Sequence, residues 1–127
     1  MGAWRMEKES LKSWLDSYGQ AWMGRDPNAA VALYTDDATY QVTPFDEALR
    51  GRAAIYKYWV GVSKTQERIH FDYEVIAVTT EKGVARWWAS FVIMPRGLET
   101  KLDGIFVVSL NSDGRCQSLR EWWHKLQ

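Results

Sequence analysis

Two carboxylates lie inside apolar segments of the last third of the chain, where acidic side chains are unusual. Asp103 stands among Leu102, Ile105 and Phe106, and Glu121 is followed by two tryptophans. Strand interiors disfavour acidic residues, and burying a charge without a partner is costly. The two acids are therefore either members of structural ion pairs or part of a pocket. In a pocket, a carboxyl group beside a substrate carbonyl can exchange a proton with it, which is general acid–base chemistry.

The segments that carry the two acids are predicted to be neighbouring antiparallel strands, joined by a turn at residues 111–114. This pairing puts Asp103 across from residues 121–123, so the two carboxylates are expected to be neighbours if both face inward. In apolar surroundings two adjacent carboxylates cannot both ionise cheaply, and one of them would stay protonated near neutral pH.

Each acid also has a purely structural interpretation. Asp103 can lie on a solvated sheet face, held by Lys101 or Arg120. Glu121 can instead form an ion pair with Arg86 or Arg120. A buried arginine needs a carboxylate partner, so a salt bridge inside the cavity is expected for Arg86, with substrate contact as the alternative.

The chain is rich in aromatic side chains, with eight tryptophans, six tyrosines and four phenylalanines in 127 residues. Such side chains fill cores, line apolar pockets or anchor interfaces. Tyr18 and Tyr40 are expected to be core residues whose hydroxyl groups reach the cavity. Trp59, Trp88 and Trp123 are expected to line the pocket or to plug it. At most one residue of each adjacent tryptophan pair can do so, because neighbouring strand residues point to opposite faces.

Periodicity divides the chain into a helical first half and a sheet in the second half. Apolar residues at helical spacing predict a helix over about 7–23, a short second helix from Asp26 that ends at Asp36-Asp37, and a third helix from Gly51. A short strand is expected over 38–43. From residue 69 the apolar period becomes two, which predicts four long strands in an antiparallel meander. The result is a single α+β domain over the whole chain, with helices on one face of a curved sheet.

Charge and composition disfavour several classes of function. The formal net charge is zero, from 16 basic and 16 acidic residues that are well interspersed, so neither nucleic acid nor a membrane is expected as a partner. There is no apolar run of signal-peptide or membrane-spanning length, which favours a cytoplasmic location. No metal-ligand spacing or phosphate loop occurs, so neither a metal nor a cofactor is expected. The lone Cys116 is interpreted as a small strand residue.

Several segments carry a resemblance to a known family that covers nearly the whole chain. They are Asp36–Tyr40, Leu49–Ile55, Leu102–Phe106, Asp113–Arg115 and Arg120–Trp123. With these segments the sequence resembles the SnoaL-like branch of the nuclear transport factor 2-like superfamily. The resemblance implies a cone, in which three N-terminal helices wrap a strongly curved antiparallel sheet around an apolar cavity. It also implies a homodimer formed through the outer faces of the sheets.

The site residues of two enzymes in this superfamily match only in part. Tyr18 and Asp103 fall where ketosteroid isomerases have an oxyanion-hole tyrosine and a protonated aspartic acid. The isomerase's general base would fall at about Val42, and valine cannot accept a proton, so steroid isomerisation is not expected. Limonene-epoxide hydrolase uses a set of aspartate, arginine and aspartate. In this sequence Glu121 falls near one of the acidic positions and Arg86 is a plausible cation, but no carboxylate is present for the remaining position.

Two classes of function therefore stay open. The first is a cofactor-independent acid–base enzyme of cyclase, isomerase, dehydratase or epoxide-hydrolase type, acting on a small and fairly apolar molecule. Its acid–base candidates are Asp103 and Glu121, with Tyr18, Tyr40 or Arg86 as hydrogen-bond donor. The second is a non-catalytic ligand-binding or dimeric scaffolding domain, because a fold alone does not define a function. An open pocket with unpaired carboxylates would favour the first, and a pocket plugged by tryptophan the second.

Overall fold

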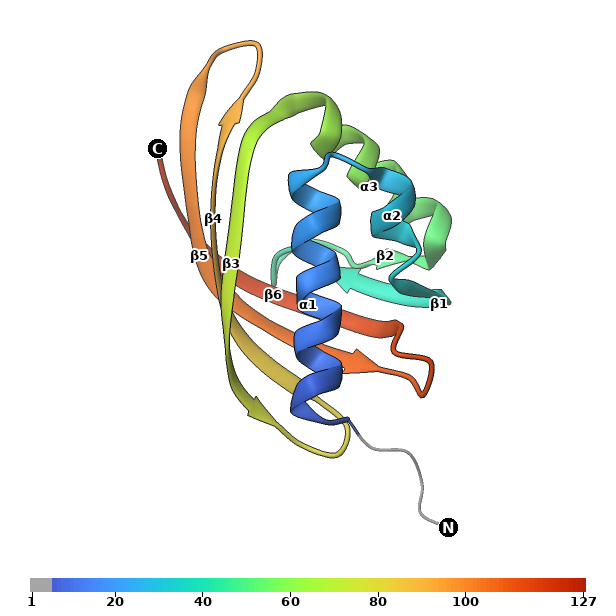
Figure 1. The fold of residues 1–127 in the computed structure, drawn as a ribbon. Coiled ribbons are helices and arrows are strands. Elements are labelled where there is room, and N and C mark those ends of the chain that lie inside the picture. Colours follow the sequence, from blue (N-terminus) through green and yellow to red (C-terminus); the bar gives the residue numbers. More distant parts are fainter. Residues whose placement is uncertain (1–5) are drawn as a thin grey trace.

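The computed structural model describes residues 6–127 and consists of three helices packed against one six-stranded sheet (Figure 1). The helices are α1 (Lys8–Met23), α2 (Pro27–Val31) and α3 (Gly51–Thr65). The strands are β1 (Tyr34–Gln41), β2 (Leu49–Arg50), β3 (Gln66–Val78), β4 (Gly83–Ile93), β5 (Leu98–Leu110) and β6 (Cys116–Leu126). The predicted α+β class, with the helices ahead of the long strands, is confirmed.

Helix α1 lies along the inner face of the sheet because its apolar residues recur at helical spacing. Its buried face consists of Leu11, Trp14, Leu15, Tyr18, Gly19, Ala21 and Trp22. The helix ends at Gly24, whose backbone N–H donates to the carbonyl of Gln20 at 2.9 Å. This helix therefore brings the hydroxyl of Tyr18, together with two hydrogen-bonded indoles, into the layer beneath the sheet.

Helix α2 begins as the sequence predicts and ends earlier. The side chain of Asp26 accepts a hydrogen bond from the backbone N–H of Ala29 at 3.0 Å, and Pro27 is the first helical residue. The helix ends at Val31, because the chain already enters β1 at Tyr34, which is fully buried. Strand β1 thus starts four residues before the predicted position.

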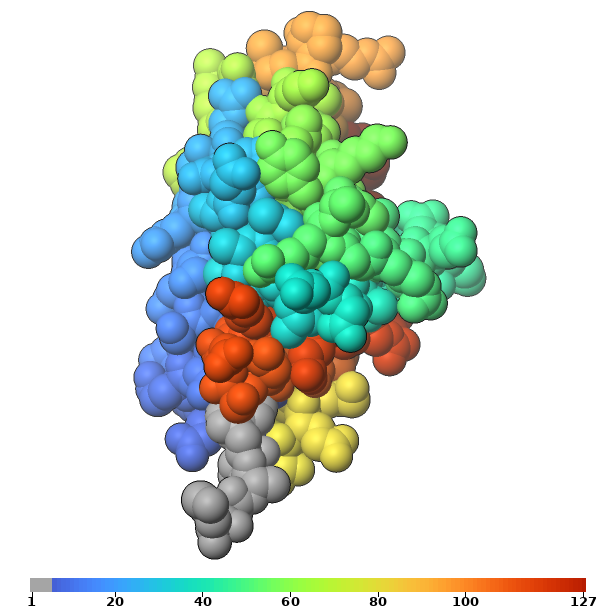
Figure 2. Space-filling model, turned by 90° about the vertical axis from the view of Figure 1, so that its right-hand side faces the viewer, coloured from blue at the N-terminus to red at the C-terminus, as the bar shows by residue number. Residues whose placement is uncertain are grey.

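The sheet has the strand order β2-β1-β6-β5-β4-β3. The four long strands form the predicted antiparallel meander, and β1 joins it by parallel pairing with β6. The sheet curves around α1 and α3 without closing (Figure 1). In the space-filling view, the three helices and the β5–β6 turn lie side by side on the surface (Figure 2). None of the helices within residues 6–127 is long and apolar enough to cross a membrane.

Aromatic rings fill the space between the helices and the inner face of the sheet. The ring of Tyr18 lies 5.3 Å from those of Phe71 and Phe106 and 5.4 Å from that of Trp59, measured between centroids. On the sheet, Trp87 and Phe106 stack at 4.9 Å. Glycine is needed at position 104, because a Cβ atom there would lie 2.1 Å from the carbonyl oxygen of Trp122 on β6.

Candidate functional site

The two candidate carboxylates lie on opposite faces of the sheet. In the pairing of β5 with β6, Asp103 is opposite His124, and Glu121 is opposite Phe106. Phe106 and Glu121 face the interior, where they are 0% and 4% exposed, whereas Asp103 is exposed on the outer face. The expectation that both acids face the cavity as neighbours is therefore wrong, since they belong to opposite sets of strand alternation.

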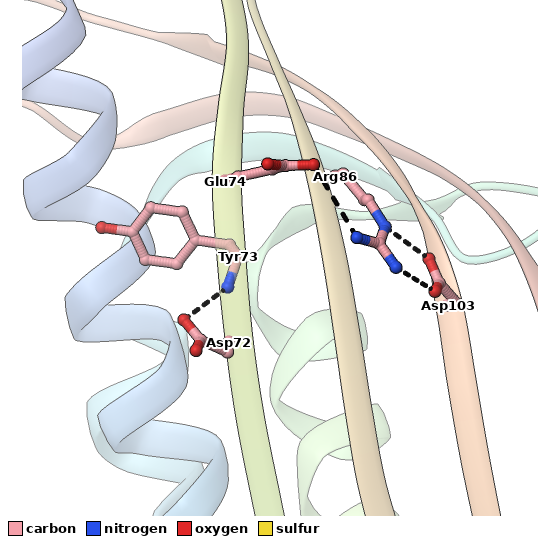
Figure 3. Close-up of polar contacts among 5 residues, drawn as sticks. All are labelled: Asp72, Tyr73, Glu74, Arg86 and Asp103. Atoms are coloured by element: carbon pink, nitrogen blue, oxygen red, sulfur yellow. Dashed lines mark hydrogen bonds and ion pairs between the residues drawn. The ribbon is translucent and has the colours of Figure 1, made fainter.

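Asp103 forms a two-point ion pair with Arg86 on the outer face (Figure 3). Arg86 Nε donates to Oδ1 at 3.1 Å and Nη2 donates to Oδ2 at 2.6 Å, while Glu74 lies 3.8 Å from Nη1. In the same view, Tyr73 of β3 points the other way, toward α1 (Figure 3). The salt bridge expected for Arg86 inside the cavity is thus found outside it, with Asp103 as the partner.

Exposure to solvent limits the contribution of this outer ion pair to the stability of the fold. The hydrogen bonds from Arg86 lower the pKa of Asp103 below its ordinary range, and the pKa of Arg86 is raised by the same contact. The two side chains are 43% and 53% exposed, and exposed pairs add little to stability. Trp88 also lies on this face, with the guanidinium carbon of Arg86 4.6 Å from its ring centroid. Asp103, Arg86 and Trp88 are therefore not parts of the interior site.

Glu121 is the interior acid, and two tyrosines accompany it. The hydroxyl of Tyr40 donates a hydrogen bond to Glu121 Oε1, and the hydroxyl of Tyr18 lies 3.4 Å from that of Tyr40. Burial raises the pKa of Glu121 from 4.5 to about 8, although the hydrogen bond from Tyr40 acts in the opposite direction. The carboxyl group is therefore mostly protonated at neutral pH, and it can both donate and accept a proton.

Three elements that are distant in the sequence hold this cluster together. Tyr18 comes from the middle of α1, Tyr40 from the end of β1 and Glu121 from β6. The parallel pairing of β1 with β6 places Tyr40 opposite Leu119 and so brings it next to Glu121. Burial also raises the pKa of the Tyr18 and Tyr40 hydroxyls, which keeps both protonated. The cluster consequently contains three protonated oxygen groups and no fixed charge at neutral pH.

A small interior cavity adjoins these groups, with a volume of about 50 Å³. It is lined by five of the residues expected there from the sequence, namely Tyr18, Tyr40, Trp59, Glu121 and Trp123. Sequence reasoning missed Tyr58 and Trp87, which also line it and which were visible only as members of apolar patterns. A volume of this size holds a few water molecules, whereas ligand pockets usually measure about 300–1,000 Å³.

Hydrogen bonds from two of the lining tryptophans join the walls of the cavity to each other. Trp123 Nε1 donates to the backbone carbonyl of Val42 at 2.9 Å, and Trp22 Nε1 donates to Gln66 Oε1 at 2.8 Å. Val42 and Trp123 are half-buried and lie where β6 meets the segment 42–48 that links β1 to β2. The rim of the cavity at this point therefore depends on one hydrogen bond between a side chain and a loop.

Larger depressions lie on the outer face of the sheet. One measures about 700 Å³ and is bordered by Arg86, Trp88, Asp103 and His124, and its neighbour measures about 570 Å³. The two depressions share His70, and no acid buried like Glu121 borders either of them among the described residues. Within residues 6–127, no three His, Cys, Asp or Glu side chains come together as metal ligands.

Comparison with known proteins places the chain in a family. The model of the SnoaL-like domain matches residues 15–119. A steroid Delta-isomerase of Nocardioides simplex is 26% identical over 113 residues, which is 89% of each chain.

Solved structures share the fold at low sequence identity. SalBIII, an epoxide hydrolase/cyclase-like enzyme described for pyran ring formation in the polyether salinomycin, has a TM-score of 0.81 at 20% identity, over 94% of this chain and 95% of its own. RV0760c of Mycobacterium tuberculosis, in complex with estradiol-17beta-hemisuccinate, has a TM-score of 0.80 at 14% identity, over 93% and 98% of the two chains. With the family model spanning most of the sequence, the chain belongs to the SnoaL-like domain family of the nuclear transport factor 2-like superfamily.

Proposed function

We propose that this protein is a cofactor-independent acid–base enzyme that acts on a small, fairly apolar molecule bound beside Glu121. The observation that carries the proposal is the environment of this acid. It is 4% exposed, its pKa is raised to about 8, and its oxygen accepts a hydrogen bond from Tyr40. A carboxyl group that titrates near the working pH is suited to moving protons in a reaction.

The cluster supplies both groups that enolisation of a carbonyl compound requires. The ionised fraction of Glu121 accepts the proton from the carbon next to the carbonyl, and a tyrosine hydroxyl donates to the carbonyl oxygen as negative charge develops there. Returning the proton to another carbon completes an isomerisation, and attack of the enolate carbon on a second carbonyl of the same molecule closes a ring. Isomerase and cyclase chemistry therefore fit the site better than epoxide hydrolysis, because Arg86 lies on the opposite face from Glu121.

The similarity to proteins named as a steroid Delta-isomerase and as a cyclase-like enzyme supports this class of reaction. The position expected for the isomerase's base is Val42, which borders the cavity and has no proton to exchange. Glu121 would have to act from β6 instead. Steroids themselves are not proposed as substrates, since the cavity of about 50 Å³ has to open even for a single six-membered ring and would have to open much further for a steroid.

The test is exchange of the α-hydrogens of cyclohexanone for deuterium, followed by NMR in D2O. Wild-type protein is expected to accelerate the exchange, and Glu121→Gln to remove the acceleration while keeping the hydrogen bond from Tyr40. Asp103→Asn is the matched control, because it removes a carboxylate from the outer face and should leave the rate unchanged. Exchange at the wild-type rate in Glu121→Gln would rule out the proposed role of Glu121.

The small volume of the cavity favours a second candidate, a dimeric scaffolding domain that acts through its outer sheet face. This face has large depressions and exposed apolar side chains, among them Trp122 at 37% and Leu126 at 68% exposure. Its partner would be a second copy, because the face carries charges of both signs and can complement itself around a twofold axis.

Light scattering after size exclusion tests this: Leu126→Arg should shift a dimer to monomer, and Phe45→Arg, on the loop between β1 and β2, should not. A monomeric wild type would exclude it.

A further inference from the structure

Several indole groups of this protein are buried or half-buried, and three of them donate to an acceptor. Trp14 Nε1 donates to the carbonyl of Leu33 at 3.0 Å, and Trp22 and Trp123 donate to the acceptors described above. Among the described residues, Trp59 Nε1 and Trp87 Nε1 are buried without a hydrogen-bond partner. Buried donors are nearly always paired, so each of these two groups requires an explanation.

The indole of Trp59 has a potential acceptor close by. The hydroxyl of Tyr34 is also buried and without a hydrogen bond of normal geometry; burial raises its pKa, and the neighbouring indole of Trp59 acts in the opposite direction. A small movement of either ring would join them. The indole N–H of Trp87, by contrast, has neither a hydrogen-bond partner nor a side-chain interaction of this kind among the described residues.

The indole of Trp87 also has little freedom to rotate toward a more distant acceptor. Its ring is 1% exposed, and it stacks on Phe106 at 4.9 Å and on Phe71 at 6.3 Å between centroids. Stacking against these two phenylalanine rings fixes the plane of the indole. The N–H group must therefore be satisfied by something that enters the space beside it, and Trp87 lines the same cavity as Glu121.

Trp87 and Glu121 approach this cavity from different strands. Trp87 is on β4 and Glu121 on β6, with β5 between them. Trp87 is level with Gly104 on β5 and with Trp123 on β6, so Glu121 lies two strand spacings across and two residues along, and the two backbones are about 12 Å apart. The cavity consequently has one polar contact at Glu121 and Tyr40 and a second, separate one at the indole of Trp87.

We propose that Trp87 is a ligand-binding residue whose Nε1–H donates to a second oxygen of the molecule bound beside Glu121. The ligand would be a small, apolar, uncharged molecule with two separated oxygen acceptors, such as a diketone or a hydroxyketone. It is uncharged because no lysine, arginine or histidine is among the described residues that line the cavity. This inference rests on the proposed function, whose substrate class it narrows.

The test compares two rings of the same size, cyclohexane-1,4-dione and cyclohexanone, by NMR titration of protein with ¹⁵N-labelled tryptophan. The dione should bind the wild type roughly 2- to 10-fold more tightly than the ketone does, the range expected for one net hydrogen bond. In Trp87→Phe, which keeps a ring for stacking, this preference should vanish. Comparing the two ratios cancels the statistical advantage of the symmetrical dione.

A matched control and a variant-free measurement keep the result interpretable. Trp59→Phe removes the other unpaired indole N–H of the cavity and should retain the preference for the dione. In the wild type, the Nε1–H signal of Trp87 should move downfield with the dione and stay near its free position with cyclohexanone. The inference is overturned if Trp87→Phe keeps the preference, or if the dione leaves this signal unmoved. Loss of deuterium exchange in Glu121→Gln is read independently, so the two proposals can fail separately.

Discussion

Replacing Glu121 by glutamine is expected to remove a decline in stability that the wild-type protein undergoes as pH rises. In the folded protein, burial raises the pKa of Glu121 from its ordinary value of 4.5 to about 8. Below pH 4.5 the carboxyl group is protonated in both the folded and the unfolded chain, so it causes no difference. Above pH 4.5 the unfolded chain releases this proton while the folded chain keeps it, so the free energy of unfolding falls until pH reaches about 8.

The size of this decline follows from the two pKa values. The step from 4.5 to about 8 corresponds to a loss of about 5 kcal/mol in unfolding free energy, complete at pH 8 and above. This figure is an upper limit, because water entering the cavity would reduce it. Since small domains unfold with about 5–15 kcal/mol, the loss is large enough to measure by urea titration.

The assay is urea unfolding of wild type and Glu121→Gln at several pH values from 5 to 8. The difference between the two curves isolates Glu121, because every other titrating group is shared. Asp103→Asn is the control. Arg86 lowers the pKa of Asp103 in the folded protein, so the contribution of Asp103 to stability is present above its ordinary pKa of 3.8 and is lost only as pH falls below that value. The unfolding free energy of Asp103→Asn should therefore run parallel to that of the wild type from pH 5 to 8. Parallel curves for Glu121→Gln would refute a buried, protonated Glu121.

Three further substitutions give direct readouts. Tyr40→Phe removes the hydrogen bond that lowers the pKa of Glu121, so the titration of its carboxyl carbon should move above about pH 8; no upward movement would show that this bond is absent in solution. Gly104→Ala should destabilise the fold by about 3 kcal/mol or more, because the new Cβ atom meets the backbone of Trp122. Gly61→Ala, in open space on α3, should instead stabilise it by about 1 kcal/mol, and equal thermal shifts for the two variants would contradict the reasoning.

The helices and the meander could be predicted because each has a clear apolar period and recognisable ends. Helix α1 and the four long strands lie within a few residues of their expected positions. Strand β1 was placed too late, since Asp36 and Asp37 read as a helix end, whereas they are exposed residues of the strand. Its parallel pairing with β6 depends on contacts between distant segments and has no local signal.

The two acids show why alternation alone could locate only half of the site. On β6, Glu121 alternates with two large apolar residues, and this pattern correctly indicates an inward direction. On β5 both faces are largely apolar, with Ile105 on the face of Asp103 and Phe106 on the other, so the pattern cannot choose between them. What fixes Asp103 outward is the complete burial of Phe106 and Val108 on the opposite face of β5, and Arg86 on the neighbouring strand then pairs with it; neither is visible in the sequence of β5 alone.

The most direct test of the central claim is the pKa of Glu121, measured by ¹³C NMR of side-chain carboxyl carbons from pH 3 to 10. A buried Glu121 held by Tyr40 predicts one glutamate that titrates near pH 8 and is missing from the spectrum of Glu121→Gln. Asp103 should titrate below its ordinary value in the same experiment. If the signal of Glu121 titrates near 4.5 instead, the carboxyl group is solvated, and the proposed acid–base site does not exist.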